Sequence, residues 1–357
     1  MSQRNSDAYP EFSKRHLCEM HWLLSMPLDH YKCAVLPAGG PIAMLDGDGA
    51  NPGAQMNVYN GAGHLLKAWD WDAGKVRDLG WTNADVMEIV TVLEDGRVML
   101  WSIHGTCTTN FALNDLIGHQ GVLRCELFPA GIVAVTAALR LVAILSFADC
   151  TCVPLAEVKL AAAPTAMAVV DRSGYTTHDY ATSPQRDWDR YRSWDRSWSC
   201  FRPQSTLCQR RCPDVLLATS SSSIFIVKQK DARGQSVAGG PFISLAPSPD
   251  GKFIAAFSAN GALLILAADL SVHLSNVVSQ DSRPPRQVRK DNPKGRVAIT
   301  RADLCAVPFA YCLAQVAWCA ADAVALLWEQ ILLVMTTTGT RANFKHSAAP
   351  LLRTEVA

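Results

Sequence analysis

The chain has 357 residues, of which 49% are hydrophobic and 18% charged, a composition that supports a large buried core. Its 33 lysines and arginines nearly balance 32 aspartates and glutamates, leaving a net charge of +1. This balance excludes an overall basic field that would draw the chain onto nucleic acid or an acidic membrane.

The beginning of the chain shows no targeting pattern. Residues 1–16 are charged and lack an apolar segment, so we expect no secretory signal peptide. The longest apolar run, 131–147, is interrupted by Arg140 and is short for a membrane span. We therefore expect the 12 cysteines to be free thiols in the cytosol.

Residues 1–30 are expected to form an N-terminal lead-in. They contain residue types found in metal sites, but the spacing matches no zinc pattern, so no metal site is expected. The four residues concerned are His16, Cys18, His21 and His30.

Residues 33–45 predict two strands separated by a tight turn at Gly39, Gly40 and Pro41. No helical pattern and no P-loop lysine follow, so the glycine pair is not interpreted as a phosphate loop. Another hairpin is expected at 56–72, around the turn at 61–63. Four nearby carboxylates are interpreted as surface turns, with calcium binding or acid–base chemistry as the alternative: Asp46, Asp48, Asp70 and Asp72.

The stretch 76–102 predicts three successive strands. Residues 76–81 alternate in polarity and contain Trp81, 87–93 are rich in β-branched residues, and 97–102 follow at once. Asp95 and Gly96 form the short turn typical of a hairpin. Further short apolar runs continue to 149, and 131–145 are interpreted as the inner pair of strands of one blade.

Residues 172–212 interrupt this pattern with interleaved arginines and aromatic residues, and are interpreted as an inserted loop. The loop is expected to be functionless or to bind a partner. RNA binding through 186–202 is the alternative, although several aspartates offset the positive charge.

The strand pattern returns at 213–228, a predicted hairpin, and 231–240 are interpreted as a connection. Residues 243–270 predict a second three-stranded meander with turns at Asp250–Gly251 and at 259–261. An inserted loop is expected at 279–313, strands at 315–335, and an unstructured tail at 339–357. A three-stranded meander that occurs at least twice predicts an all-β fold. We expect a β-propeller with WD40-like blades over 31–338. Its last blade could be complete or incomplete.

No GxSxG, HExxH, P-loop, kinase or CxxC motif occurs. We expect no catalytic, cofactor-binding or metal-binding residue, no cofactor and no enzymatic activity. The alternatives are a propeller enzyme with a pocket that uses Asp46, Asp48 or His119, and a WD-like adaptor that binds RNA.

Several stretches in order resemble the N-terminal region of the vacuolar protein sorting-associated protein 16 family. They are AGGPIAML, MNVYNGAGHLL, DAGKVRDLGW, VLEDGRVMLWSIHG, GIVAVT, PDVLLATSSSSIFIV, LAPSPDGKFIAAFSANGALLILAADL and QVAWCAADAVALLWEQILLV, over most of 33–338. The residues that match the family's motifs, with an expected structural role, are Gly39, Gly40, Pro41, Trp81, Asp95, Gly96, Asp250, Gly251, Trp318, Cys319 and Asp322.

The resemblance implies a β-propeller within the HOPS and CORVET tethering complexes, which bring endosomes and lysosomes or vacuoles together before membrane fusion. It implies work by protein interfaces with other HOPS and CORVET subunits, without nucleic acid or membrane insertion. The location implied is cytoplasmic and peripheral on the late endosome, lysosome or vacuole. The family's helical solenoid, which docks the SNARE-binding subunit, is not in this chain, so that contact is not expected.

Overall fold

Short antiparallel strands make up nearly all of the described structure. The computed structural model describes residues 26–277 and 315–345, apart from 27, 37–38, 83–86, 114–120, 129, 171–211, 260, 271–272, 320–321, 329–330 and 337–340. In these residues the strands form six four-stranded sheets, and one 3-10 helix, η1 (Leu28–His30), precedes the first. None of their helices is long and apolar enough to cross a membrane.

The first three sheets follow one another along the chain. The first contains β1 (Tyr31–Val35), β2 (Ile42–Asp46), β3 (Gln55–Tyr59) and β4 (Leu65–Asp70). The second contains β5 (Val76–Trp81), β6 (Ile89–Leu93), β7 (Arg97–Trp101) and β8 (Cys107–Ala112). The third contains β9 (Val122–Phe128), β10 (Gly131–Thr136), β11 (Leu141–Ile144) and β12 (Cys152–Pro154).

The other three sheets repeat this order. The fourth contains β13 (Ala166–Val170), β14 (Asp214–Ala218), β15 (Ser223–Val227) and β16 (Ala232–Ser236). The fifth contains β17 (Phe242–Pro247), β18 (Phe253–Ser258), β19 (Leu263–Ala267) and β20 (His273–Val277). The sixth contains β21 (Gln315–Trp318), β22 (Ala323–Trp328), β23 (Ile331–Thr336) and β24 (Arg341–Lys345).

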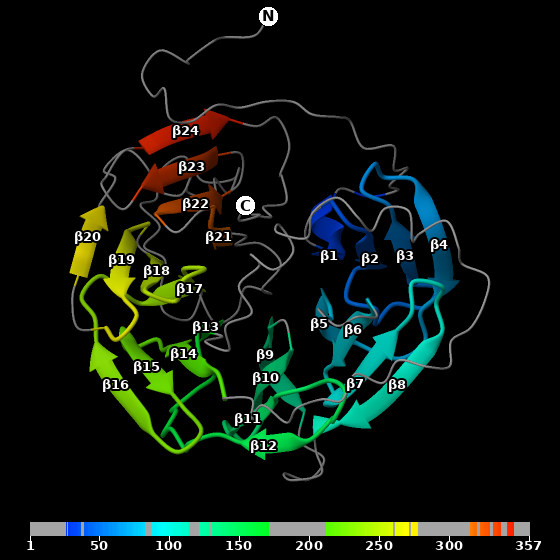
Figure 1. Cartoon of the computed structure of the whole chain (residues 1–357), viewed down its shortest axis with the longest axis horizontal. Helices are drawn as coiled ribbons and strands as arrows, with labels where there is room; N and C mark the ends of the chain where they lie inside the picture. Colours follow the sequence, from blue (N-terminus) through cyan, green and yellow to red (C-terminus); the bar gives the residue numbers. More distant parts are fainter. Residues whose placement is uncertain are drawn as a thin grey trace, which may run out of the picture.

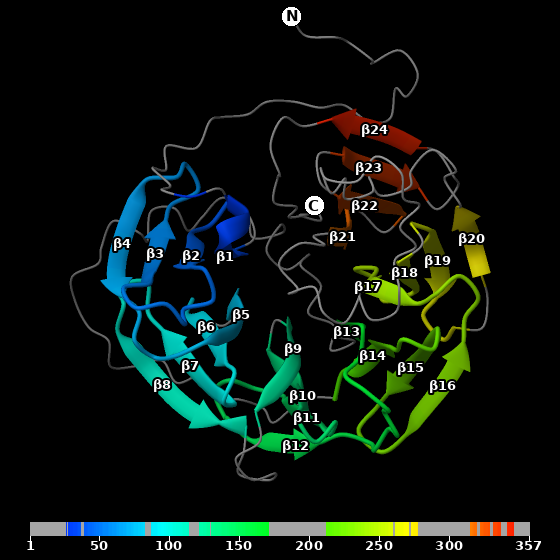
Figure 2. The ribbon, with the colours of Figure 1, turned by 180° about the vertical axis from the view of Figure 1, so that it is seen from behind.

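The sheets are arranged radially around a centre, as Figures 1 and 2 show from opposite sides. In every sheet the strands pair in sequence order, so the first strand lies innermost and the fourth outermost. The first strands of successive sheets contact one another from β1 to β21. This arrangement is that of a β-propeller and confirms the fold class expected from the repeated meanders.

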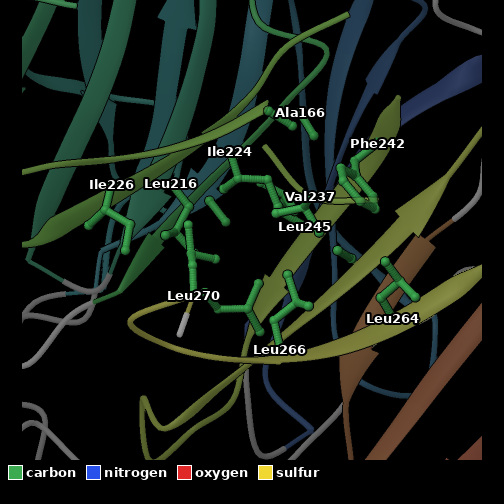
Figure 3. Close-up of a cluster of buried hydrophobic side chains, with 14 of the residues drawn as sticks. Ala166, Leu216, Ile224, Ile226, Val237, Phe242, Leu245, Leu264, Leu266 and Leu270 are labelled. Atoms are coloured by element: carbon green, nitrogen blue, oxygen red, sulfur yellow. The ribbon is translucent and has the colours of Figure 1, made fainter. Parts of the chain in front are cut away.

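The core consists of apolar layers between neighbouring sheets. One buried cluster joins each successive pair, from the first and second sheets to the fifth and sixth. Figure 3 shows the layer between the fourth and fifth sheets, where Leu216, Ile224 and Ile226 meet Phe242, Leu264 and Leu266. Second strands such as β6 (IVTVL) and β10 (GIVAVT) are buried throughout, because a sheet covers each of their faces.

Three expectations for individual segments are wrong. The first concerns strand position only: the run 131–145 does form the inner two strands of the third sheet, β10 and β11, but neither is the strand nearest the centre, which is β9. Residues 231–240, interpreted as a connection, contain the outer strand β16. Residues 341–345, within the predicted tail, form β24 and complete the sixth sheet. The outer strands β16 and β24 were missed because their solvent-facing side chains leave little apolar pattern.

Candidate functional site

Charged side chains gather on the innermost strands of the first three sheets, and we call Lys32, Asp78, Arg124 and Glu126 the hub charges. They lie on β1, β5 and β9, and each side chain keeps partial solvent contact. The innermost strands of the fourth and fifth sheets, AMAVV and FISLAP, carry no charged residue. Among the described innermost strands, these charges therefore lie on the first three sheets.

The hub charges affect one another electrostatically. Desolvation raises the pKa of Glu126 to about 8, and the neighbouring Asp78 adds to this shift while Arg124 opposes it. Desolvation also raises the pKa of Asp78 to about 6, against the lowering effects of the Leu79 N–H, Lys32 and Arg124. Burial lowers the pKa of Arg124, which nevertheless stays charged at neutral pH. Near neutral pH, Glu126 therefore carries a proton and Asp78 is mostly ionised.

Polar side chains near the hub also connect neighbouring sheets. Lys32 Nζ donates to the Arg77 carbonyl at 3.1 Å, from the first sheet to the second. An Arg124 guanidinium N–H donates to the Thr165 carbonyl at 2.8 Å, and Thr165 Oγ1 donates to the Phe242 carbonyl at 2.6 Å. These bonds continue around the ring from the third sheet to the fifth, so the hub side chains help hold the sheets together.

Trp81 and Trp318 have equivalent positions at the ends of innermost strands. The indole N–H of Trp81 donates to the Ala34 carbonyl in β1 at 3.0 Å. The indole N–H of Trp318 donates to the Ala246 carbonyl in β17 at 2.9 Å. Each tryptophan thus bonds the innermost strand of the preceding sheet and also packs in the layer between the two sheets.

The other motif residues form turns. Gly39 has φ 69° in the β1–β2 turn, which the Leu36 N–H closes by bonding the Pro41 carbonyl at 3.0 Å. A Cβ on Gly40 would lie 2.8 Å from the Leu36 side chain, so a larger residue does not fit there.

The Asp-Gly turns are equivalent in the second and fifth sheets. Asp95 Oδ1 accepts the Arg97 N–H at 3.0 Å, and Gly96 has φ 91°. Asp250 Oδ1 accepts the Ser248 hydroxyl at 2.6 Å and the Lys252 N–H at 3.1 Å. Gly251 has φ 65°, a conformation that a glycine adopts without steric cost.

The final motif positions close the β21–β22 turn, where the Cys319 N–H donates to the Ala323 carbonyl at 2.8 Å and Asp322 lies exposed. The motif residues are therefore distributed over the first, second, fifth and sixth sheets. They do not form one site.

The hub charges were missed by sequence reasoning. Their signal in the sequence was weak: Asp78 lies inside the predicted strand 76–81, and no strand was predicted at 122–128.

Three of the four carboxylates considered for catalysis or calcium accept hydrogen bonds within or between strands and turns, and the fourth, Asp72, is exposed. Asp46 Oδ2 accepts the Gln55 N–H at 3.3 Å, and Asp48 Oδ1 accepts the Ala50 N–H at 3.1 Å. Asp70 Oδ1 accepts from Gln55 Nε2 at 3.2 Å. Within the described ranges, no three His, Cys, Asp or Glu side chains are grouped to hold a metal ion. His119, His16, Cys18 and His21 lie outside those ranges.

The described part of the chain contains seven cysteines, and none of these forms a disulfide. This agrees with the expectation of thiols for that part. Burial raises the pKa of Cys33 to about 12 and that of Cys212 to about 11, so neither is a thiolate at neutral pH. Apart from Cys212, the arginine- and tryptophan-rich loop at 172–212, with its alternative of RNA binding, lies outside the described residues, as does the loop at 279–313.

A family model described as "Vps16, N-terminal region" matches residues 3–300. The chain belongs to the Vps16 family. The Vps16 match confirms the resemblance that the ordered sequence stretches indicated.

Curated relatives of this family match the chain at low identity. The vacuolar protein sorting-associated protein 16 homolog of Dictyostelium discoideum is 21% identical over 328 residues, which cover 90% of this chain and 32% of that protein. The probable homolog of Schizosaccharomyces pombe is 21% identical, over 97% of this chain and 35% of its own length. Protein VACUOLELESS1 of Arabidopsis thaliana is 20% identical, over 96% of this chain and 36% of its own length. The chain thus spans about a third of the length of these relatives.

A solved structure supports the fold independently. The β-propeller domain of Cps50 (Swd1) from Myceliophteria thermophila has a TM-score of 0.51 and 10% sequence identity, and the match covers 90% of this chain and 88% of that chain. At this identity the likeness shows the β-propeller fold alone.

Proposed function

We propose that this chain is a non-enzymatic scaffold module in vacuolar protein sorting, as part of the HOPS and CORVET tethering complexes. The observation that carries the proposal is the Vps16 family match over residues 3–300, a range that includes the first five sheets. The names of the relatives from Dictyostelium and Schizosaccharomyces refer to vacuolar protein sorting. The chain acts through protein interfaces on endosomal and vacuolar or lysosomal membranes, where it is held peripherally by its partner subunits.

The geometry supports a scaffold better than an enzyme. The polar side chains near the centre are engaged in holding sheets together, through Lys32, Arg124 and Thr165. The acidic pair of the hub is split between two sheets, and burial raises the pKa of the neighbouring Cys125 thiol well above its ordinary value, so this thiol is not a nucleophilic thiolate at neutral pH. A rigid propeller instead offers faces and edges on which other proteins dock.

Co-purification with defined partners tests the proposal. The tagged chain is co-expressed with the other HOPS and CORVET subunits, except the SNARE-binding subunit, and purified by tag affinity and size exclusion. We expect at least one subunit to co-elute with the chain in a stoichiometric peak. If the folded chain elutes by itself in every co-expression, whichever subunit is present, the result would contradict the proposal.

A further inference from the structure

The outermost strand of the first sheet, β4, has an unusually apolar edge. Leu65 and Leu66 are 55% and 51% exposed, among the highest values for large hydrophobic residues in the described structure. The strand lies at the end of its sheet in the order β1-β2-β3-β4, and Figure 1 shows it at the rim of the molecule. In the described residues no strand pairs with its outer side, so its outward backbone groups are available.

The backbone alternation identifies which groups point outward. The Trp71 N–H donates to the Ala54 carbonyl at 2.7 Å, so the backbone of Trp71 faces β3. Because successive residues of a strand alternate, the N–H and C=O groups of Ala68 and Asp70 face away from β3. These are the groups that an added strand would bond.

The strand is held in place from its inner side. The ring of Trp69 lies 6.0 Å from that of Trp101 in β7, with the ring planes tilted by 32°. A Cβ on Gly105 would lie 2.9 Å from the Trp69 ring, which shows how closely the β7–β8 turn covers it. A fixed edge binds an extended segment with a smaller entropic cost than a mobile edge does.

Two other outer strands are shorter or more polar than β4. β12 has three residues and ends at Pro154, and β16 (ARGQS) contains an arginine, a glycine and no large apolar residue. β4 instead has Lys67 beside its leucines, an exposed cation for which the described residues supply no ion-pair partner. Pairing of β4 with a second copy centred on this residue would place two lysines opposite each other, which is unfavourable. A segment with a carboxylate at that place would be attracted.

We propose that β4 is a docking edge for an extended segment of a partner protein. The segment adds to the first sheet as a fifth strand, by backbone hydrogen bonds to Ala68 and Asp70. Its apolar side chains cover Leu65 and Leu66, and an aspartate or glutamate faces Lys67. This surface goes beyond membership of a tethering complex, and its test does not depend on that membership.

The test uses fluorescein-labelled synthetic decapeptides of alternating valine and threonine, with one aspartate moved through the central positions. Fluorescence polarisation measures their binding to the full chain. We expect one aspartate position to bind best, and the same peptide with lysine there to bind about tenfold more weakly. Two further peptides carry N-methyl groups on alternate backbone amides, one peptide for each edge of the extended strand. Only the peptide methylated on the edge that faces β4 should lose binding, because that edge forms the hydrogen bonds.

Variants place the site on β4. Ala68→Pro removes an outward N–H without removing a bond to β3, and should weaken binding at least about tenfold. Ser236→Pro, at an outward position of β16, is the matched control and should leave binding unchanged. Lys67→Glu should reverse the preference from the aspartate peptide to the lysine peptide.

Three results would overturn the proposal. The first is that no peptide binds the wild-type chain. The second is that peptides methylated on either side bind equally well, and the third is that the best peptide binds Ala68→Pro as tightly as it binds the wild type. Sedimentation that shows a dimer lost in Ala68→Pro would assign the edge to a second copy instead. Circular dichroism checks that the variants fold. The methylated peptides keep the test decisive even if Ala68→Pro does not fold, because they leave the chain unaltered.

Discussion

Glu126 and Asp78 show how the ring geometry changes the chemistry of single residues. Their carboxyls approach from β9 and β5, and both are largely enclosed by protein while keeping some solvent contact. The loss of hydration raises the pKa of both carboxyls, and the charge of Asp78 raises that of Glu126 further. These carboxyls make the stability of the hub depend on pH.

Glu126→Gln should flatten that dependence. The folded-state pKa of Glu126 is about 8, above its ordinary value of 4.5, so the folded chain retains this proton longer than the unfolded chain does. The free energy of unfolding should therefore fall as pH rises from about 5 to 8, by about 1–3 kcal/mol after a discount for the remaining solvent contact. Urea unfolding at several pH values measures this slope. Parallel profiles for the variant and the wild type would show that Glu126 has no such role.

Trp318→Phe should destabilise the joint between the fifth and sixth sheets. The phenyl ring keeps the stacking on Phe253, where the ring centres are 6.2 Å apart, but it lacks the N–H that bonds the Ala246 carbonyl. The expected cost is about 1–3 kcal/mol, because the buried carbonyl loses its partner. Chemical denaturation followed by circular dichroism measures it, and a change below about 0.5 kcal/mol would contradict the assigned bond.

At the scale of elements, the hairpin turns help fix the register in which neighbouring strands pair. Gly251 adopts φ 65°, and a Cβ there would meet Val170 at an ordinary contact distance of 3.4 Å. Gly251→Ala should therefore cost about 1–2 kcal/mol from backbone strain alone. Gly251→Asn should cost less, because asparagine tolerates this conformation better. Thermal unfolding compares the two variants, and an equal loss for both would point to steric crowding instead.

The same turns explain which elements the sequence could predict. Asp95–Gly96 and Asp250–Gly251 separate apolar runs, and the predicted strands around them agree with β6, β7, β17 and β18 to within a few residues. Outer strands such as β16 and β24 have one open edge and few apolar side chains, so periodicity did not reveal them. The hub charges escaped prediction because their meaning depends on contacts between sheets that are distant in sequence.

For the molecule as a whole, stability depends on five apolar layers that join neighbouring sheets. Each sheet packs against the next one along the chain, as in other repeat architectures in which interfaces between units supply cooperativity. A substitution that disrupts the packing of one layer should therefore destabilise first the two sheets that form this layer.

Phe242→Ala tests this view in the layer of Figure 3. Phe242 is fully buried among residues of the fourth and fifth sheets, so its truncation should cost about 3–5 kcal/mol. Hydrogen exchange read by mass spectrometry should accelerate most in β13–β15 and β17–β19, and least in β1–β4. Gln235→Ala, on the exposed edge strand β16, is the control. Uniform acceleration in all sheets would show that the ring opens only as one unit.

Affinity purification of the tagged chain from cells of its own organism, read by quantitative mass spectrometry, tests the proposed scaffold role most directly. A Trp81→Ala, Trp318→Ala variant, which weakens two joints between sheets, is purified in parallel. Enrichment of HOPS or CORVET subunits with the wild-type chain, and their loss with the variant, is the predicted result. Recovery of chaperones alone with the wild-type chain would contradict the proposal that this propeller assembles with the tethering subunits.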